Sequence, residues 1–204
     1  MARKKSYKTE ASRTLLDDIL DFVKVFAISA IVILLFVNFI AHPVTVVGHS
    51  MDPTLQNGEY GFTSVISPMV SDPSRGDIVV VNQKNEQGET ERWVKRVIGL
   101  PGETIECRNG KVYVDGVVLD ESSYLKQDFI DEALAKYKAD HGQQDYGTFN
   151  YDFSPVTLGE DEYWVMGDNR MNSKDSREIG PIKKDEIYGM GVLVLYPFNA
   201  MGVK

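Results

Sequence analysis

The most pronounced pattern in the chain is an apolar run close to its N-terminus. The 17 residues from Val25 to Ala41 (VFAISAIVILLFVNFIA) include no charged side chain. This length is at the lower limit for crossing a bilayer, and Phe22 and Val23 extend it because Lys24 can reach the headgroups. A run that is apolar on every face is not typical of a helix in a soluble protein. We therefore predict one transmembrane anchor helix over residues 21–42.

The flanks of this run predict its orientation. No basic residue follows it before Arg75, whereas the tail before it carries Arg3, Lys4, Lys5, Lys8 and Arg13. The positive-inside rule then places the tail, residues 1–20, in the cytoplasm and the remaining chain outside. A cleavable signal peptide is the alternative, but its apolar region is usually shorter and ends in a small-x-small site. The sequence after Asn38 (NFIAHP) has no such site, which favours a retained anchor.

After the anchor, short apolar segments alternate with turn signals, which is typical of β-strands. Asn109-Gly110 separates two such segments and predicts a β-hairpin. The Pro/Ser/Asp-rich segment 67–76 predicts a loop. The predicted strands are residues 44–47, 60–66, 77–83, 90–98, 103–108, 111–115, 163–166 and 187–196.

Residues 121–160 interrupt this alternation of apolar segments and turn signals. Asp128 is a typical helix start, and Ile130, Leu134 and Tyr137 follow it at helical spacing. Residues 141–154 are polar and rich in Gly and Gln, so we expect this tip to be partly mobile. The fold class is therefore mainly β, with antiparallel sheets over residues 43–204 and a small α/β insertion at 121–160. The sequence gives no role for the insertion.

Composition excludes several classes of protein. The chain has 204 residues, of which roughly 160 follow the anchor and suit one domain. Residues 43–204 hold 16 basic and 26 acidic side chains, a net charge of −10, which is unsuited to nucleic-acid binding. The single cysteine, Cys107, cannot form an intramolecular disulfide and is expected to be buried in a strand. The histidines are scattered, so we predict no metal site and no cofactor.

Ser50 is a candidate nucleophile nine residues after the apolar run. Gly48 allows close backbone approach and Pro53 restrains the turn that follows. A serine hydroxyl is a weak nucleophile until a base takes its proton. His49 is a poor base because adjacent side chains diverge, and a Ser/His/Asp triad would require His141, which lies in the insertion. These positions favour a base other than histidine.

Lys95 is the candidate base. In a strand over residues 90–98, alternate side chains point to opposite faces. Lys95 then lies between Trp93 and Val97 and shares their face with Glu91. This apolar setting lowers the pKa of a lysine, as a general base requires. The opposite face carries Arg92, Val94, Arg96 and Ile98. Of these, Arg96 is free to pair with a carboxylate.

Four segments together resemble a known family. They are GHSMDPTL, RGDIVVV, WVKRVIGLPGE and GDNRMNSKDSREIG, and they lie within residues 43–193. The last segment alone reads as a polar loop, residues 167–177, able to orient a base. In this order and spacing, the four are similar to the characteristic segments of the type I signal peptidases. Members of that family are membrane-anchored Ser/Lys proteases that remove signal peptides from exported proteins.

This resemblance implies roles for individual residues. Ser50 would be the acylating nucleophile, with its backbone N–H as an oxyanion donor, and Lys95 the general base. Ser173 would hydrogen-bond the lysine. Asp175 would be a structural carboxylate, with Arg177 and Arg96 as its candidate partners. The substrate would be the extended Ala-x-Ala-like end of a signal peptide, cleaved at the outer membrane surface without metal or cofactor. Pockets for its small side chains would be lined by Val44, Val46, Met51, Leu55, Trp93 and Val94.

Two positions depart from the family pattern. Gly48 stands where some members carry a Ser or Thr that donates to the oxyanion, so a second donor is not provided there. Met171 replaces the aspartate common after Gly-Asp-Asn-Arg. The single anchor and Gly48 resemble Gram-positive members more than the two-span Gram-negative type.

Two other functions are compatible with parts of the chain. Self-cleaving repressor proteases also use a Ser/Lys pair on a β-fold, but the anchor and the acidic charge argue against that class. A membrane-tethered binding module without catalysis is the second, and the presence of Ser50, Lys95 and Ser173 argues against it.

Overall fold

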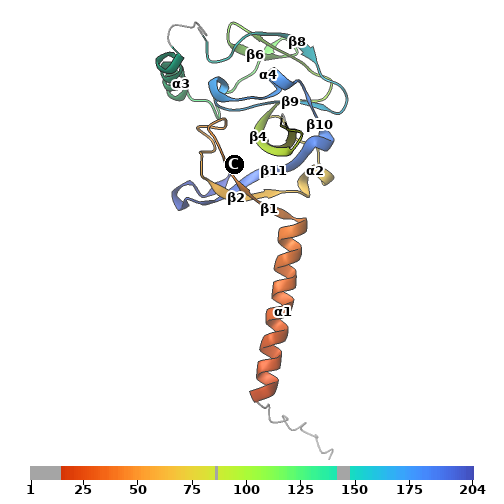
Figure 1. The fold of residues 1–204 in the computed structure, drawn as a ribbon. Coiled ribbons are helices and arrows are strands. Elements are labelled where there is room, and N and C mark those ends of the chain that lie inside the picture. Colours follow the sequence, from red (N-terminus) through yellow and green to blue (C-terminus); the bar gives the residue numbers. More distant parts are fainter. Residues whose placement is uncertain (1–14, 86, 142–147) are drawn as a thin grey trace, which may run out of the picture. The chain divides into compact units, whose positions relative to one another are not determined.

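The computed structural model describes residues 15–85, 87–141 and 148–204, and the chain divides into two compact units, Met1–Asn38 and Phe39–Lys204. The described part of the first unit is helix α1 (Leu15–Phe39; Figure 1). Its candidate membrane span, Leu15–Val37, has 23 residues, so it extends ~35 Å and is long enough to cross a bilayer. The helix begins six residues before the predicted start, with Asp17 and Asp18 in its first turn, where carboxylates favour the helix dipole.

The second unit contains an antiparallel eight-stranded sheet in the order β1-β2-β11-β3-β4-β9-β10, with β12 paired to β11. A separate antiparallel sheet has the order β7-β6-β5-β8. The strands of the large sheet are β1 (Ala41–Thr45), β2 (Tyr60–Ser64), β3 (Ile78–Lys84), β4 (Thr90–Gly99), β9 (Glu162–Met166), β10 (Ile182–Lys183), β11 (Ile187–Tyr196) and β12 (Gly202–Val203). Those of the small sheet are β5 (Thr104–Arg108), β6 (Lys111–Val114), β7 (Val117–Val118) and β8 (Phe153–Thr157).

Short helices occupy the connections. They are α2 (Ser67–Val70), α3 (Gln127–His141), α4 (Ser176–Ile179) and the 3₁₀ turns η1 (Arg170–Asn172), η2 (Lys184–Glu186) and η3 (Phe198–Ala200). The prediction of a loop over residues 67–76 is therefore wrong at its start. Pro68 lies in the first turn of α2, where its missing N–H costs no hydrogen bond.

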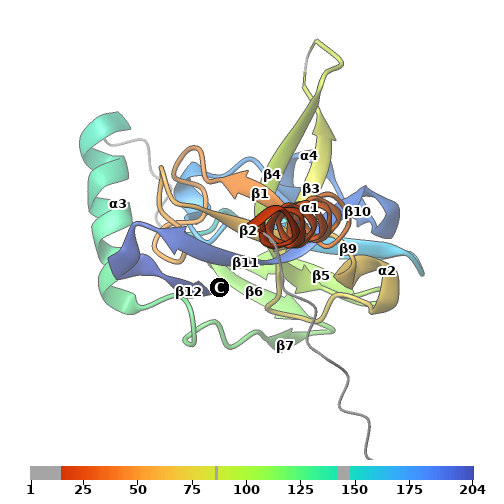
Figure 2. The same cartoon turned by 90° about the horizontal axis from the view of Figure 1, so that it is seen from below.

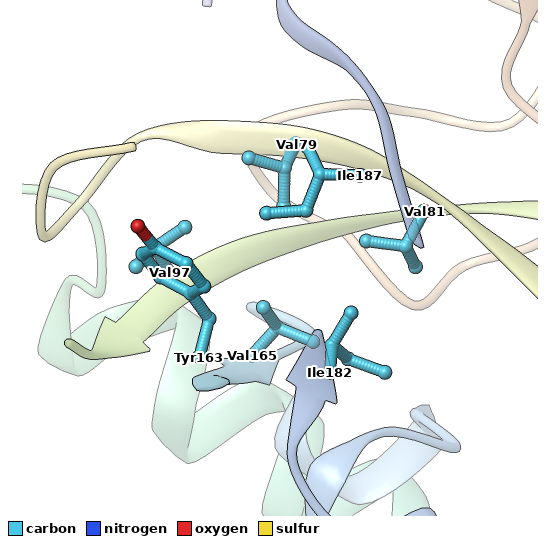
Figure 3. Close-up of a cluster of buried hydrophobic side chains, with 7 residues drawn as sticks. All are labelled: Val79, Val81, Val97, Tyr163, Val165, Ile182 and Ile187. Carbon is cyan, nitrogen blue, oxygen red and sulfur yellow. The ribbon is translucent and has the colours of Figure 1, made fainter. Parts of the chain in front are cut away.

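The core is built on both faces of β4. Val97 belongs to a buried cluster, shown in Figure 3, against which Trp93 packs. Val94 packs against a second cluster near β1, and Ile98 lies in a third that joins the small sheet to β9. The predicted alternation along this strand is confirmed, and it leaves Lys95 on the face of Trp93. The cluster in Figure 3 consists of Val79, Val81, Val97, Tyr163, Val165, Ile182 and Ile187.

The main expectations from sequence are confirmed, and one needs refinement. The sheets are antiparallel, and Asn109 and Gly110 have φ angles of 51° and 73°, as the predicted hairpin turn requires. Cys107 is buried in β5. The insertion is more integral than predicted, because β8 pairs with β5 inside the small sheet. Residues 1–14 and 142–147 lie outside the described residues, so the cytoplasmic tail and the mobile tip stay predictions.

A buried ion pair attaches the insertion to the loop after β9. The guanidinium of Arg170 is fully buried and pairs with Glu121 at the start of the insertion. It also donates to the Asn150 side chain at 3.0 Å and to the Gly167 carbonyl at 2.9 Å. An unpaired charge at such a position is strongly destabilising. Glu121 therefore helps to hold the 167–177 loop in place.

We predict that Glu121→Gln lowers the free energy of unfolding by about 3 kcal/mol, because the shape is retained while the buried Arg170 loses its counter-charge. Denaturant unfolding of the detergent-solubilised chain, followed by near-UV circular dichroism, measures this change. Glu160→Gln is the matched control at an exposed position and should change stability by at most about 0.5 kcal/mol. Equal stabilities of the two variants would contradict a structural role for the pair.

Candidate active site

Ser50 lies in the turn between β1 and β2, and buried neighbours fix this turn. Met51 and Leu55 are almost completely buried, and the Leu55 N–H donates to the Met51 carbonyl at 3.0 Å. Gly48 has a φ of 91°, in the region that favours glycine, and its N–H donates to Asn57 Oδ1 at 2.9 Å. The hydroxyl of Ser50 is thus held on a rigid support.

Lys95 reaches Ser50 from the centre of the large sheet. Its Nζ donates to Ser50 Oγ at 3.0 Å, although the two residues are 45 positions apart in the chain. Lys95 is only 4% exposed, and its ammonium lies 5.7 Å from the centre of the Trp93 ring. The structure therefore brings together the two residues that the sequence analysis proposed as nucleophile and base.

Burial controls the protonation of this lysine. It lowers the pKa of Lys95 from 10.5 to about 8, since an ammonium ion loses its hydration inside the protein. The negative charge of Asp175 opposes this effect and raises the pKa, whereas the positive charge of Arg177 lowers it. A lysine with a pKa of about 8 has a useful neutral fraction near neutral pH, as a general base requires.

Asp175 is the centre of the loop beside Lys95. Its carboxylate accepts hydrogen bonds from the Gly167 N–H at 2.9 Å and from Ser173 Oγ at 2.7 Å. The guanidinium of Arg177 adds two more, from Nε at 2.8 Å and from Nη2 at 2.9 Å. Burial alone would raise the pKa of Asp175, but these bonds and the charge of Arg177 hold it below its usual value. The carboxylate therefore stays ionised beside the lysine.

Ser173 contacts this carboxylate and not the lysine. Among the described hydrogen bonds, Ser173 Oγ donates to Asp175 and none joins it to Lys95. The resemblance implied a bond to the lysine itself. In this structure Ser173 hydrogen-bonds Asp175, whose negative charge raises the pKa of Lys95.

Gly167 lets the loop approach the Ser50 turn closely. The Asn169 N–H donates to the Ser50 carbonyl at 3.0 Å. A Cβ atom at residue 167 would overlap both this carbonyl and the side chain of Ser173. Glycine is therefore required where the backbone passes between these two residues.

Arg96 has a different partner from the one expected. It forms a two-pronged ion pair with Asp168, from Nε to Oδ1 at 2.8 Å and from Nη2 to Oδ2 at 2.7 Å. Thr54 donates to the same carboxylate at 2.5 Å. The prediction that Arg96 is a partner of Asp175 is wrong, because strand β4 pairs with β9 so that Arg96 lies opposite Met166, close to Asp168.

Asp168 and Thr54 were missed by the sequence analysis. Both lie in segments that it singled out, but only the pairing of β4 with β9 shows that they meet Arg96. This contact joins the Ser50 turn, strand β4 and the 167–177 loop.

Five of the six predicted pocket residues lie together. Val44, Val46, Met51, Leu55 and Val94 gather in one apolar cluster beside Ser50. Met51 and Leu55 are buried, so they support this surface from behind, while Val44 and Val94 are partly exposed. Trp93 is the exception, since it lies on the opposite face of β4 with Lys95.

We predict that Lys95 titrates at about pH 8 in the full-length protein in detergent. NMR of the chain labelled with ¹³C at the lysine Cε carbons measures this value, and Lys95→Arg identifies the resonance. Asp175→Asn should lower the pKa further, because the carboxylate that favours the ammonium is removed. A Lys95 resonance that titrates near 10.5, or a rise in Asp175→Asn, would contradict this account.

Comparisons with known proteins indicate the family of this chain. Residues 19–196 match the family model described as signal peptidase, peptidase S26. A signal peptidase I of Bacillus amyloliquefaciens is 40% identical over 196 residues, which cover 96% of each chain. Signal peptidase I S of Bacillus subtilis is 40% identical over 90% of this chain and 92% of its own length. A crystal structure of a signal peptidase I from Enterococcus faecalis is 32% identical and covers 62% of this chain and 98% of its own, with a TM-score of 0.42. The chain therefore belongs to the type I signal peptidases, a family of serine peptidases.

Proposed function

We propose that this chain is a signal peptidase I that cleaves exported preproteins after small-x-small motifs with a Ser50/Lys95 dyad. The observation that carries this proposal is the 3.0 Å contact between Lys95 Nζ and Ser50 Oγ, at a lysine with only 4% exposure. The contact between the two side chains and the lowered pKa of Lys95 therefore favour the same pair of residues.

The dyad accounts for each proton that is transferred. Neutral Lys95 takes the proton from Ser50 Oγ as the oxygen attacks the scissile carbonyl. The peptide bond breaks, Lys95 gives this proton to the leaving amine, and an acyl-enzyme on Ser50 remains. Lys95 next takes a proton from water, the resulting hydroxide attacks the acyl carbonyl, and the proton returns to Ser50. At pH 7 about a tenth of a lysine with a pKa near 8 is neutral and able to begin this cycle.

The Ser50 backbone N–H is the proposed oxyanion donor. Among the described hydrogen bonds, none uses this N–H group. The Gly48 N–H is already bound to Asn57, and Gly48 offers no hydroxyl. One protein donor therefore lies next to the reacting carbonyl, and a second would come from water or the substrate.

Two strand edges support an extended substrate. Strand β1 is the last strand of the large sheet. Strand β4 pairs with β9 only over Arg96, Val97 and Gly99, so its earlier residues present one unpaired edge. An extended signal peptide can add to such edges through its backbone. Its small side chains would then face the apolar cluster at Val44 and Val94.

The proposed location is the outer face of the cytoplasmic membrane. Helix α1 is apolar enough to cross the bilayer, and the basic residues before it favour a cytoplasmic N-terminus. From Ala41 to Ser50 the chain reaches at most ~30 Å when extended. This tether would keep the active site near the bilayer, where signal peptides emerge.

We predict that Ser50→Ala, Lys95→Ala and Lys95→Arg each abolish cleavage of a preprotein. The first lacks the nucleophile, the second lacks the base, and the third keeps a guanidinium that does not deprotonate. The measurement is cleavage by the detergent-solubilised chain, with N-terminal sequencing of the product, which should begin after a small-x-small triplet. Lys111→Ala is the control, because Lys111 is exposed on the small sheet.

Retained cleavage in any of these three variants would remove the dyad from the mechanism. A product that begins elsewhere would refute the proposed motif. If the folded wild type cut none of several preproteins, a membrane-tethered binding role would be favoured instead.

We predict that Gly167→Ala lowers kcat/KM about 100-fold, because the added methyl group displaces the Ser50 carbonyl or Ser173. The matched control is Gly159→Ala, where the nearest atom to the new methyl group is a flexible Glu162 oxygen at 3.2 Å. The assay is steady-state cleavage, with circular dichroism to verify the fold. Unchanged kinetics in Gly167→Ala would show that the close approach has no role in catalysis.

A further inference from the structure

Helix α3 of the insertion lies beside the catalytic loops, and cavities separate them. Figures 1 and 2 show α3 next to the loop that joins β1 to β2. Three adjoining cavities, of about 330, 260 and 470 Å³, are lined by residues of α3 together with residues of the Ser50 turn or the 167–177 loop. We call this hollow the α3 groove. Its central residues are His49, Asp52, Ala133, Lys136, Tyr137 and Asn169.

The Ser50 turn separates the α3 groove from the apolar cluster. Met51 and Leu55 point into the apolar cluster, on the side proposed for the signal peptide. His49 and Asp52 line the groove. Ser50 has one chain neighbour on each side of this division, because His49 lines the groove and Met51 packs in the apolar cluster. Asn169, which lines the groove, also donates its N–H to the Ser50 carbonyl, so the groove adjoins Ser50 on the side away from the apolar cluster.

Two residues that line the groove each have a side-chain oxygen without a hydrogen-bond donor among the described residues. Asp52 Oδ1 and Asn169 Oδ1 are shielded from solvent, and neither has a hydrogen-bond partner among the described residues. The other oxygen of Asp52 is occupied by the His49 ring at 3.0 Å. Buried acceptors without partners are costly, and a rotation of these two side chains toward the groove would let backbone N–H groups of an extended peptide satisfy them.

The groove also has apolar wall area for side chains. Phe129 lines the largest cavity, and Tyr137 lines the other two. Pockets that combine aromatic walls with a few placed polar groups are typical of binding sites. An extended polypeptide provides both the N–H groups and the side chains that such a surface accepts.

We propose that the α3 groove binds the first residues of the mature protein, on the far side of the scissile bond from the signal peptide. This inference rests on the proposed function, because it requires a substrate that crosses Ser50. It gives the insertion a role in substrate selection, because the groove would bind residues that remain on the mature protein after cleavage.

The test compares two peptides with the same signal-peptide end. The short peptide ends one residue after the scissile bond, and the long peptide continues for about six residues, which extend ~20 Å. We expect the wild type to show a kcat/KM about tenfold higher for the long peptide. The difference should lie in KM and not in kcat, because contacts in the groove would stabilise the bound substrate and the transition state equally.

Ala133→Trp should fill the groove and reduce this long-to-short ratio to about one. Ala135→Trp is the matched control, because Ala135 is exposed on the same helix and does not line the three cavities. Its ratio should equal that of the wild type. Lys136→Ala removes an exposed side chain at the groove, so it tests the same site if Ala133→Trp does not fold; its ratio should fall about threefold.

The outcomes separate this inference from the proposed function. If the wild type cuts neither peptide, the proposed function fails. If it cuts both with equal kcat/KM, or if the folded groove variants keep the wild-type ratio, the α3 groove does not bind the mature segment. An equal fall in Ala135→Trp would also overturn the inference.

Discussion

The burial of one ammonium group sets the requirements that the rest of the site meets. Removing Lys95 from water costs several kcal/mol when it is charged, and this cost is the origin of its lowered pKa. The cost is limited by the Ser50 hydroxyl, the Trp93 ring and the charge of Asp175. In the proposed mechanism, Lys95 must be shielded from water so that its pKa is low enough for it to lose its proton. It must also stay close enough to Ser50 to accept the hydroxyl proton.

The loop that carries Asp175 has little regular structure, so charged contacts hold it in place. Arg177 binds Asp175, Arg96 binds Asp168, and Arg170 binds Glu121. These arginines come from the loop itself and from β4, and their carboxylates lie in the loop and in the insertion. Each pair is largely buried, so loss of one partner would leave a charge without compensation. The loop is thereby attached to the sheet on one side and to the insertion on the other.

Local patterns predicted much of the fold, whereas contacts between distant segments did not follow from them. The alternation along β4 correctly separated the face of Lys95 from that of Val94, and Asn109-Gly110 correctly marked a hairpin. Ser50 and Lys95 were paired through the family resemblance, since neither residue is distinctive alone. The partner of Arg96 was wrong because it depends on the register between β4 and β9, which no local pattern encodes.

Strand β1, the first strand of the domain, forms one edge of the large sheet, and no other described strand pairs with its outer side. Strand β1 begins two residues after α1 ends and leads, through the Ser50 turn, to β2. An unpaired edge strand invites association with other chains, and proteins usually cover or shorten it. Under the proposed function, this edge is needed for the signal peptide, so the usual protection would block the substrate. Under the same proposal, tethering to the membrane would protect the edge in another way, because it would limit which other chains the edge meets.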